Sequence, residues 1–398
     1  MTKKKPRIRF AGFDDDWEQR KLGDVGSVSM CHRVFKEQTS DSGDIPFYKI
    51  GTFGEQADAY ISNELFTEYK KKYAYPQKGD ILISASGSIG RIVEFTGKNE
   101  YFQDSNIVWL SHDNRLDNLF LKCFYSVVKW AGIEESTIKR LYNDNILNTV
   151  ISMPIVNEQK KIGTYFTEFD KLITLHQRKY DKLVNVKKSM LEKMFPKNGA
   201  NVPEIRFVGF TKDWERRKWS DTVDISTEMV DPKSGKFNEL PHVAPGNIES
   251  FTGQLYDNIK LVKDENLISG KFHFYDGDII YGKINPQLGK YVFARFEGIT
   301  SADAYVLNAK NGLVQEYLYS ILQTRNFFNY SVSVSKRSGI PKINRDELSA
   351  YSFLAPKKEE QKQIGDMLLS LDHLIALQRR KVEKLQSIKK ACIEKMFV

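Results

Sequence analysis

The chain of 398 residues contains two copies of one plan. The 19 residues that begin at Pro6 match those that begin at Pro203 in 12 positions. The 38 residues that begin at Glu158 match those that begin at Glu360 in 19 positions. A period of about 200 residues is far longer than the units that stack in solenoids. The sequence therefore predicts two similar globular halves, each followed by the same second element.

The second element of each half is predicted to be a long helix. Apolar residues recur at alternating spacings of four and three over about five heptads, which is typical of a coiled-coil seam. Polar residues interrupt the pattern at the same two places in both copies. A helix that exposes such a seam needs a partner, so we expect an antiparallel pair; the alternative is two independent helices, each packed on its own domain. The predicted seam residues are Ile162, Phe166, Phe169, Ile173, Tyr180 and Leu183 in the first copy and Ile364, Leu368, Leu371, Ile375, Val382 and Leu385 in the second.

The globular halves have a mixed pattern. Short alternating runs between Gly, Ser and Asn turns predict strands, and each half also contains one predicted helix, at Asn118–Trp130 and at Val314–Tyr330. We therefore predict an α+β, pseudo-twofold symmetric chain, with two tandem mixed α/β domains separated by two long helices that form an antiparallel coiled coil. The predicted boundaries are 1–155 for the first domain, 156–197 for the first helix, 198–355 for the second domain and 356–398 for the second helix.

The net charge of +9 is concentrated in the two helical segments. Residues 156–197 hold 10 Lys and Arg against 5 Asp and Glu, and residues 356–398 hold 10 against 6. Both globular halves are formally neutral. The surplus fits solvated faces of Lys-rich helices and, equally, contact with an anionic partner such as nucleic-acid phosphates.

Motifs for catalysis are absent from the sequence. It contains no GxxxxGK[ST], no HExxH and no GxSxG, and its six histidines do not pair at metal-ligand spacing. Three widely spaced cysteines are typical of reduced thiols in a cytoplasmic protein. No run approaches the roughly 18 apolar residues that a membrane helix needs. We expect a cytoplasmic protein with no catalytic residue, no bound metal, no cofactor of its own and no membrane contact.

The middles of the two halves diverge and contain the candidate binding residues. The first half reads GDILISASGSIGR from Gly79, and the second reads GDIIYGKINPQLGK from Gly277. Arg and Lys suit guanine edges, Asn and Gln suit adenine, and Ser suits bases or phosphates. Lys-Arg pairs at matching positions favour phosphate contact, whereas polar loops without any ligand are the plain alternative. The candidates are Ser84, Ser86, Ser88, Arg91, Lys139 and Arg140, and then Lys283, Asn285, Gln287, Lys290, Lys336 and Arg337.

Three repeated or distinctive motifs together resemble the specificity subunit of a type I restriction–modification enzyme. They are IRFxGFxxxWExRK, the GDILISASGSIGR run, and P-x-x-x-EQxxIG at Pro154 and again at Pro356. The resemblance covers essentially the whole chain, although the second half lacks the Ser-rich form of the GDI run. It implies two target recognition domains that each read one half of a bipartite, asymmetric site in double-stranded DNA, and helices that set the spacer.

The resemblance also implies a subunit without catalytic activity that works in a complex. Its partners would be two modification subunits, which use S-adenosylmethionine, and two restriction subunits, which use ATP and Mg. Two other classes of protein compete with this interpretation. One is a nuclease–methyltransferase fusion fragment, which the missing cofactor and metal motifs disfavour, and the other is a coiled-coil adaptor with no nucleic-acid role.

Overall fold

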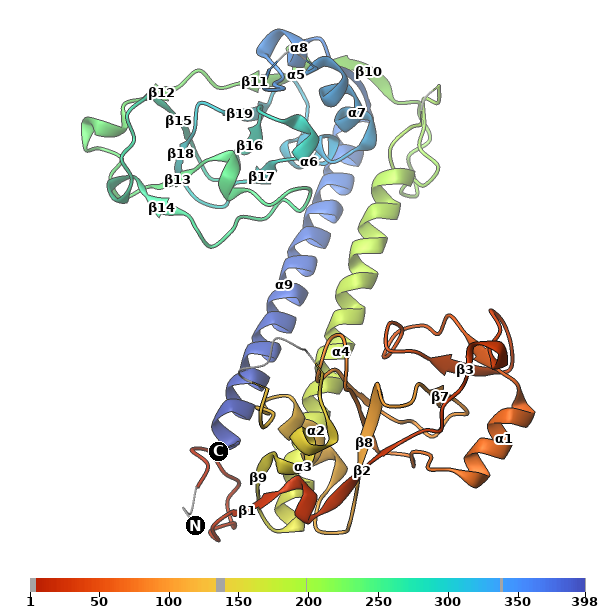
Figure 1. Cartoon of the computed structure of the whole chain (residues 1–398). Helices are drawn as coiled ribbons and strands as arrows, with labels where there is room; N and C mark the ends of the chain where they lie inside the picture. The colour runs from red at the N-terminus through yellow and green to blue at the C-terminus, as the bar shows by residue number, and fades with distance from the viewer. Residues whose placement is uncertain (1–4, 134–139, 198, 337–338, 398) are drawn as a thin grey trace. The chain divides into compact units, whose positions relative to one another are not determined.

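The computed structural model describes residues 5–133, 140–197, 199–336 and 339–397 (Figure 1). The chain forms two compact units. The first unit comprises Met1–Leu175 and Val382–Val398, and the second comprises His176–Lys381. Each unit therefore contains one globular part together with a portion of both long helices. Among the described residues, no helix has the length and apolar character needed to cross a membrane.

The two predicted long helices are α4 (Val156–Lys193) and α9 (Lys358–Met396), which run side by side (Figure 1). Within the second unit, His176 Nδ1 lies 2.8 Å from Gln378 Oε1, and Lys187 forms a buried ion pair with Asp372. Residue numbers rise along α4 as they fall along α9, so the helices are antiparallel. The prediction of an α+β chain with a paired, antiparallel helix element is confirmed.

The polar interruptions of the seam form specific contacts. In the first unit Lys389 Nζ lies 2.5 Å from Asp170 Oδ1. This ion pair is the counterpart, in the repeat, of the pair between Lys187 and Asp372. Burial raises the pKa of the Asp372 carboxyl, although the ammonium of Lys187 acts in the opposite direction. The cost of burying this pair leaves it little net stabilisation, and such polar pairs are best attested as devices that fix register.

The predicted seam residues are shielded from water along both long helices. All twelve are buried or half-buried, whereas most of the residues between them are exposed. Ile162 and Phe166 belong to the core of the first globular part, and Ile364 and Leu368 belong to the core of the second. Each long helix is thus joined at its beginning to a globular part through one continuous apolar core.

The first globular part contains two larger sheets and two apolar cores: helices α2 and α3 contribute to one core, and α1 and the smaller sheet contribute to the other. Strands β2, β8, β5 and β6 form an antiparallel sheet in that order, and β4, β3 and β7 form a smaller sheet in which β3 and β7 are parallel. Strand β1 pairs with β9 near the start of α4. The bounds are β1 Glu18–Lys21, β2 Gly26–Met30, β3 Ile45–Tyr48, β4 Tyr60–Ile61, α1 Asn63–Lys72, β5 Ile81–Ser84, β6 Ile92–Glu94, β7 Tyr101–Phe102, β8 Ile107–His112, α2 Asn118–Tyr125, α3 Asn143–Asn148 and β9 Val150–Met153.

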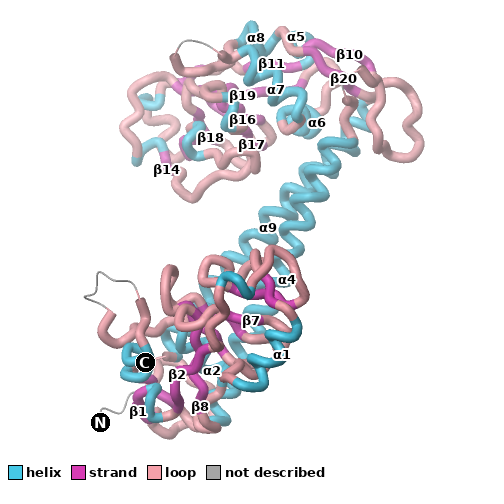
Figure 2. The backbone as a smooth tube through the Cα atoms, turned by 45° about the vertical axis from the view of Figure 1, so that its right-hand side comes forward, coloured by secondary structure: helices cyan, strands magenta, loops and turns pink. Residues whose placement is uncertain are grey.

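The second globular part repeats this plan with a larger distal sheet. Strands β11, β19, β16 and β17 form the counterpart of the first sheet, β12, β15, β18, β13 and β14 form the distal sheet, and β10 pairs with β20. Loops connect most of these short strands (Figure 2). The bounds are β10 Glu215–Lys218, α5 Trp219–Thr222, β11 Val223–Ile225, β12 Met229–Val230, β13 Pro241–Val243, β14 Lys260–Leu261, β15 Lys271–Phe274, β16 Ile279–Gly282, β17 Tyr291–Phe293, β18 Gly298–Thr300, β19 Ala304–Ala309, α6 Gln315–Leu322, α7 Arg325–Val334, α8 Arg345–Ser349 and β20 Ser352–Ala355.

The helices predicted within the globular halves differ from those observed. The helix expected to run to Trp130 ends at Tyr125, where Ser126 closes the last turn by donating its side chain to the carbonyl of Cys123. The single helix expected at Val314–Tyr330 is two helices, α6 and α7. The chain breaks between them because the side chain of Thr324 caps α7 by accepting a hydrogen bond from Phe327 N.

A buried ion pair anchors each globular part to the start of its long helix. Arg9 donates from Nε and a terminal nitrogen to both carboxylate oxygens of Glu158, at 2.7 Å each. Arg206 donates to Glu360 in the same way, at 2.7 and 2.8 Å. The hydrogen bond to Glu158 raises the pKa of Arg9. The two motifs that are most alike in the two halves, IRFxGF and EQxxIG, therefore meet in space.

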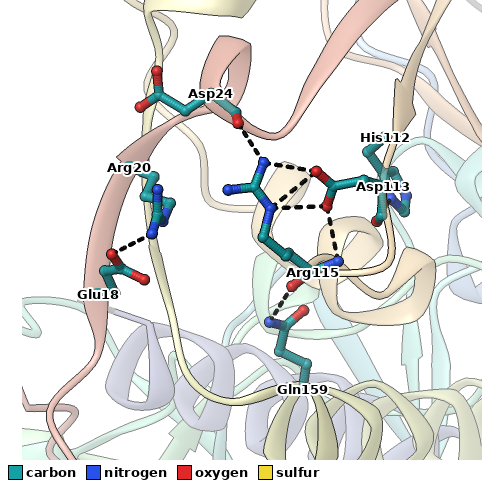
Figure 3. Close-up of polar contacts among 7 residues, drawn as sticks. All are labelled: Glu18, Arg20, Asp24, His112, Asp113, Arg115 and Gln159. Atoms are coloured by element: carbon teal, nitrogen blue, oxygen red, sulfur yellow. Dashed lines mark hydrogen bonds and ion pairs between the residues drawn. The ribbon is translucent and has the colours of Figure 1, made fainter.

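The glutamine of the EQxxIG motif makes a second anchor (Figure 3). Gln159 accepts from Asp117 N at 2.9 Å and donates to the carbonyls of Arg115 and Pro154 at 2.9 and 2.8 Å. Arg115 is held in turn by both oxygens of the Asp113 carboxylate. The glycine of the motif is required by a close approach, since a Cβ at Gly163 would lie 2.5 Å from Leu119 Cβ.

The buried anchor predicts a large effect of removing its arginine. Arg9→Ala leaves the fully buried Glu158 carboxylate without its partner, so we expect the free energy of unfolding to fall by about 3 kcal/mol. Denaturant unfolding of the whole chain measures this change. Lys171→Ala, which removes an exposed ion pair with Glu168 on α4, is the control and should change stability by less than about 0.5 kcal/mol. Equal effects of the two substitutions would contradict the anchor.

The helix interface makes a second prediction, with neighbouring residues as test and control. Ile173 is a half-buried seam residue, whereas Leu172 beside it is 41% exposed. Ile173→Glu places a charge at the interface and should lower stability by about 2 kcal/mol or more, whereas Leu172→Glu should leave it nearly unchanged. Thermal unfolding compares the two variants. Similar melting temperatures for Ile173→Glu and the unmodified chain would show that the seam is wrongly placed.

Candidate nucleic-acid interface

The β5–β6 loop (residues 85–91) in the first unit is held by its own hydrogen bonds. Gly90 has a φ of 81°, in the left-handed region that glycine adopts without strain. The hydroxyl of Ser84 donates to the carbonyl of Ser88 and accepts from Arg91 N at 2.8 Å. Ser84 is buried. Its hydroxyl makes both of these contacts inside the loop and thereby shapes the loop.

Two other segments lie against this loop. The hydroxyl of Ser86 donates to Asn106 Oδ1 at 2.8 Å, and Leu141 N donates to the carbonyl of Ala85 at 2.7 Å. Ser86 also forms an isolated β-bridge with Arg140. The structure thus brings the GDI run of the first half next to the segment that follows the Lys-Arg pair.

The predicted side chains of the first half differ in what they can offer a ligand. Ser88 is exposed at the tip of the loop. Arg91 is also exposed, but it donates to the carbonyl of Phe53 at 2.7 Å and lies 3.4 Å from the Glu55 carboxylate. Arg91 therefore joins the β5–β6 loop to the segment that contains Phe53 and Glu55, and only part of its guanidinium remains available to a ligand.

Of the Lys-Arg pair in the first half, the structure describes Arg140. Arg140 donates to the carbonyl of Ser105 at 3.3 Å, and its guanidinium lies 5.9 Å from the centre of the Tyr142 ring. The ring of Tyr142 is 55% exposed. Lys139, the other predicted member of the pair, lies outside the described residues. A half-buried arginine beside an exposed aromatic ring suits contact with a phosphate or a base face.

The β16–β17 loop (residues 283–290) in the second unit has the same surroundings. Asn285 adopts a left-handed conformation with a φ of 51°, and its N–H donates to the carbonyl of Pro341 at 2.7 Å. Gln287 is exposed and donates to Asn285 Oδ1 at 3.2 Å. The two amides thus form one donor–acceptor surface at the tip of the loop.

Cations gather at the start of this loop. Lys283 Nζ and the Arg345 guanidinium carbon each lie 5.5 Å from the centre of the Tyr305 ring. Partial burial lowers the pKa of Lys283; the nearby Asp303 acts in the opposite direction, and the positive charges of Lys342 and Arg345 lower it further. Like charges held together in this way favour an anion such as a phosphate group.

The remaining predicted residues lie at the edge of the site. Lys290 donates to the carbonyl of Ile248, and its ammonium lies 5.6 Å from the Tyr256 ring centre, so it holds two loops together. Lys336 is exposed just beyond the end of α7. Arg337 lies outside the described residues.

Sequence reasoning missed several residues of these sites because they are remote in the sequence from the diverged runs. Asn106 and Tyr142 in the first unit, and Lys342 and Arg345 in the second, reach the loops only through the sheet and the β-bridges. Lys342 could have been found, because it follows the Lys-Arg pair by five residues in a cationic stretch. Nothing in the sequence singles out Asn106.

The described residues hold no group of three His, Cys, Asp or Glu side chains that could bind a metal ion. All three cysteines are free, and burial raises the pKa of Cys31 and of Cys123 to about 12. Such thiols are poor nucleophiles because little thiolate forms near neutral pH.

Comparison with known proteins gives one family. The family described as "Type I restriction modification DNA specificity domain" matches residues 14–185 and 211–387. A Haemophilus influenzae protein assigned as a type I restriction enzyme specificity subunit is 60% identical over 167 residues, which is 42% of this chain and 43% of that protein. The specificity subunit of the Escherichia coli type I restriction enzyme EcoDI is 32% identical over 38% of this chain and 33% of its own length. The matched stretches thus span less than half of either relative.

A solved structure supports the fold. The S subunit of a type I restriction–modification system from M. genitalium superimposes with a TM-score of 0.66 over 99% of both chains, at 12% sequence identity. This likeness concerns the arrangement of the backbone. The two matches of the family cover most of both halves of the repeat, and the chain therefore belongs to the family of type I restriction–modification DNA specificity subunits, which are not catalytic.

Proposed function

We propose that this chain reads a bipartite, asymmetric DNA site, one half-site with residues 1–155 and the other with residues 198–355. The observation that carries the proposal is one loop arrangement with two sets of side chains. In each unit a loop after an equivalent strand is bridged to the segment that follows α2 or α7. The tips differ, with Ser86 and Ser88 in one loop and Asn285 and Gln287 in the other. The same frame with different polar groups suits two different base sequences.

The chemistry of each loop supports a division of labour. The paired amides of Asn285 and Gln287 match the donor–acceptor pattern of adenine in the major groove. Lys283 and Lys342 lie beside them as cations for phosphate oxygens, and Arg140 does so in the first unit. Each half of the chain is formally neutral outside the long helices, so attraction to DNA is local and nonspecific binding is weak.

The long helices are proposed to act as a ruler. Helices α4 and α9 have 38 and 39 residues, which corresponds to about 57 Å for each. Their pairing resists bending, so the spacing between the half-sites would be fixed by the protein. Domains that bind one face of B-DNA lie a whole number of turns apart, so we expect half-site centres about 10 base pairs apart.

The helices also offer equivalent surfaces to partner subunits. Leu172 and Leu175 on α4 are 41% and 49% exposed, and their counterparts Leu374 and Leu377 on α9 are 42% and 40% exposed. Two equivalent apolar patches on one chain suit two copies of one partner. We assign this partner as the modification subunit, which would bring S-adenosylmethionine, with two restriction subunits that use ATP and Mg joining the complex through it.

Base readout is tested with the chain in complex with its modification subunits. A library of duplexes with randomised positions first identifies the preferred bipartite sequence. Asn285→Ala and Gln287→Ala should then weaken discrimination at one half-site by about 1–3 kcal/mol for each lost base contact and leave the other half-site unchanged. Ser86→Ala and Ser88→Ala are the matched controls and should affect only the other half-site.

Three results would contradict this assignment. If the Asn285 and Gln287 variants lose affinity equally for every duplex, these amides touch only the DNA backbone. If the unmodified complex selects no bipartite sequence, the proposed function is wrong. If the modification subunits bind this chain while the complex binds no DNA, the chain is a coiled-coil adaptor.

Docking of the modification subunits is tested by Leu172→Glu and Leu374→Glu. Each substitution places a charge in one exposed apolar patch, so we expect each variant to bind one modification subunit more weakly and the double variant to lose both. Sedimentation of the purified complex measures the stoichiometry. Because both leucines are exposed in the isolated chain, its melting temperature should stay the same. Full occupancy of both subunits on the double variant would place the docking surface elsewhere.

A further inference from the structure

A second loop of the second unit, the supporting loop (residues 248–254), packs directly against the β16–β17 loop. Phe251 N donates to the carbonyl of Gly289 at 2.9 Å, and Tyr291 Oη donates to the carbonyl of Phe251 at 3.0 Å. The ammonium of Lys290 donates to the carbonyl of Ile248. These three hydrogen bonds join the supporting loop to the end of the loop that presents the two amides.

The ring of Phe251 makes this contact specific. A Cβ at Gly289 would lie 2.4 Å from the Phe251 ring, so the two can meet only because residue 289 is a glycine. Phe251 itself has a φ of 62°, in the left-handed region that aromatic residues rarely occupy. Its ring also lies 5.5 Å from the ring centre of Phe328 at the start of α7. The surroundings therefore hold Phe251 in a conformation that costs free energy, which suggests a role for its position.

The supporting loop is also tied to the long helix α9. Glu249 accepts a hydrogen bond from an Arg379 terminal nitrogen at 2.6 Å, through an oxygen that also accepts from Thr252 Oγ1 at 3.1 Å. The carboxylate of Glu249 is four-fifths buried, so the ion pair is partly shielded from water. At the position of α4 that corresponds to Arg379 stands Gln177, which donates to Asp181 on its own helix. The tie to the helix is thus a feature of the second half of the repeat.

We propose that the supporting loop positions the β16–β17 loop for base readout, and that Glu249, Phe251 and Arg379 are positioning residues for specificity. This inference rests on the proposed function. An amide that reads a base through paired hydrogen bonds must be held to within about 0.5 Å and 10–20°. Inside the β16–β17 loop, Leu288 N and Gly289 N donate to the carbonyls of Asn285 and Pro286, so the turn holds its own shape, and its orientation depends on the contacts at its two ends. The path from Arg379 through Glu249 and Phe251 to Gly289 connects the β16–β17 loop to the long helix α9.

The proposal also explains why two lysines of the diverged run differ in use. Lys290, at the end of the β16–β17 loop, donates a hydrogen bond to the supporting loop. Lys283, at the beginning of the β16–β17 loop, lies near the positive charges of Lys342 and Arg345. The loop is therefore fixed at its far end, and its tip, with Asn285 and Gln287, projects between the two fixed points. Movement of the supporting loop would turn both amides together, so it would alter which base they match more than how tightly DNA is held.

The test compares base discrimination by complexes of this chain with its modification subunits. Randomised duplexes are the probe, and the measured quantity is the preference for the best base over the others at each half-site. Glu249→Gln and Arg379→Gln should each reduce the preference at the second half-site roughly three- to fivefold, the effect of losing a partly exposed ion pair. The exchange Glu249→Arg with Arg379→Glu should restore it. Asp366→Asn, which breaks an exposed ion pair with Lys362 on the same helix, is the control and should change nothing.

Phe251→Gly separates positioning from folding. Glycine adopts the left-handed conformation without strain, so the backbone can remain while the ring is lost. We expect a loss of preference at the second half-site of roughly tenfold, with the first half-site unchanged and the thermal unfolding of the chain close to that of the unmodified protein.

The outcomes are distinguishable. If the unmodified complex has a preferred bipartite sequence and all three single variants keep its full selectivity, the inference is overturned and the proposed function stands. A uniform loss of affinity for every duplex, with selectivity intact, also overturns it, because that is the result of a merely structural contact. An unmodified complex without any sequence preference contradicts the proposed function and this inference with it.

Discussion

The buried pair of an arginine and a glutamate at the start of each long helix is the interaction on which the rest of the structure depends. Glu158 and Glu360 are fully out of contact with water, and each is held by both arms of one arginine. A carboxylate in such a place is tolerable only with its partner, so the IRFxGF segment must be folded against the helix. The pair thereby fixes where the globular part meets its helix.

Buried and half-buried charges also restrict how the two long helices pair. An apolar seam alone would allow several registers, because leucine and isoleucine pack against each other in many ways. The ion pairs of Asp170 with Lys389 and of Asp372 with Lys187 restrict this choice, since a shift by one heptad would leave a half-buried or buried charge alone. Burying two charges costs about as much free energy as their pairing returns, so the Lys187–Asp372 pair contributes to register more than to stability.

On this fixed frame the two loops are free to differ. The β5–β6 loop is closed by Ser84 and tied by Arg91, whereas the β16–β17 loop uses a left-handed Asn285 and is tied by Lys290 to the supporting loop. The β5–β6 loop forms a β-bridge with the segment that follows α2, and the β16–β17 loop forms one with the segment that follows α7. The side chains at the tips can therefore change while the backbone that carries them stays in place, which is the physical basis of our proposal that one scaffold reads two different half-sites.

The sequence by itself determined the duplication and the two long, paired helices, because heptad periodicity and repeated motifs are local and additive signals. It also pointed to the diverged runs, and part of those runs does lie at the two loops. It could not tell that Ser84, Arg91 and Lys290 serve the backbone, nor that one predicted helix is broken at Thr324. It gave no sign of Asn106, or of the path from Arg379 through Glu249 and Phe251 to Gly289. Those contacts join segments tens to hundreds of residues apart in the sequence. Only the tertiary structure decides which polar group of a loop forms a hydrogen bond with another loop and which remains available to a ligand.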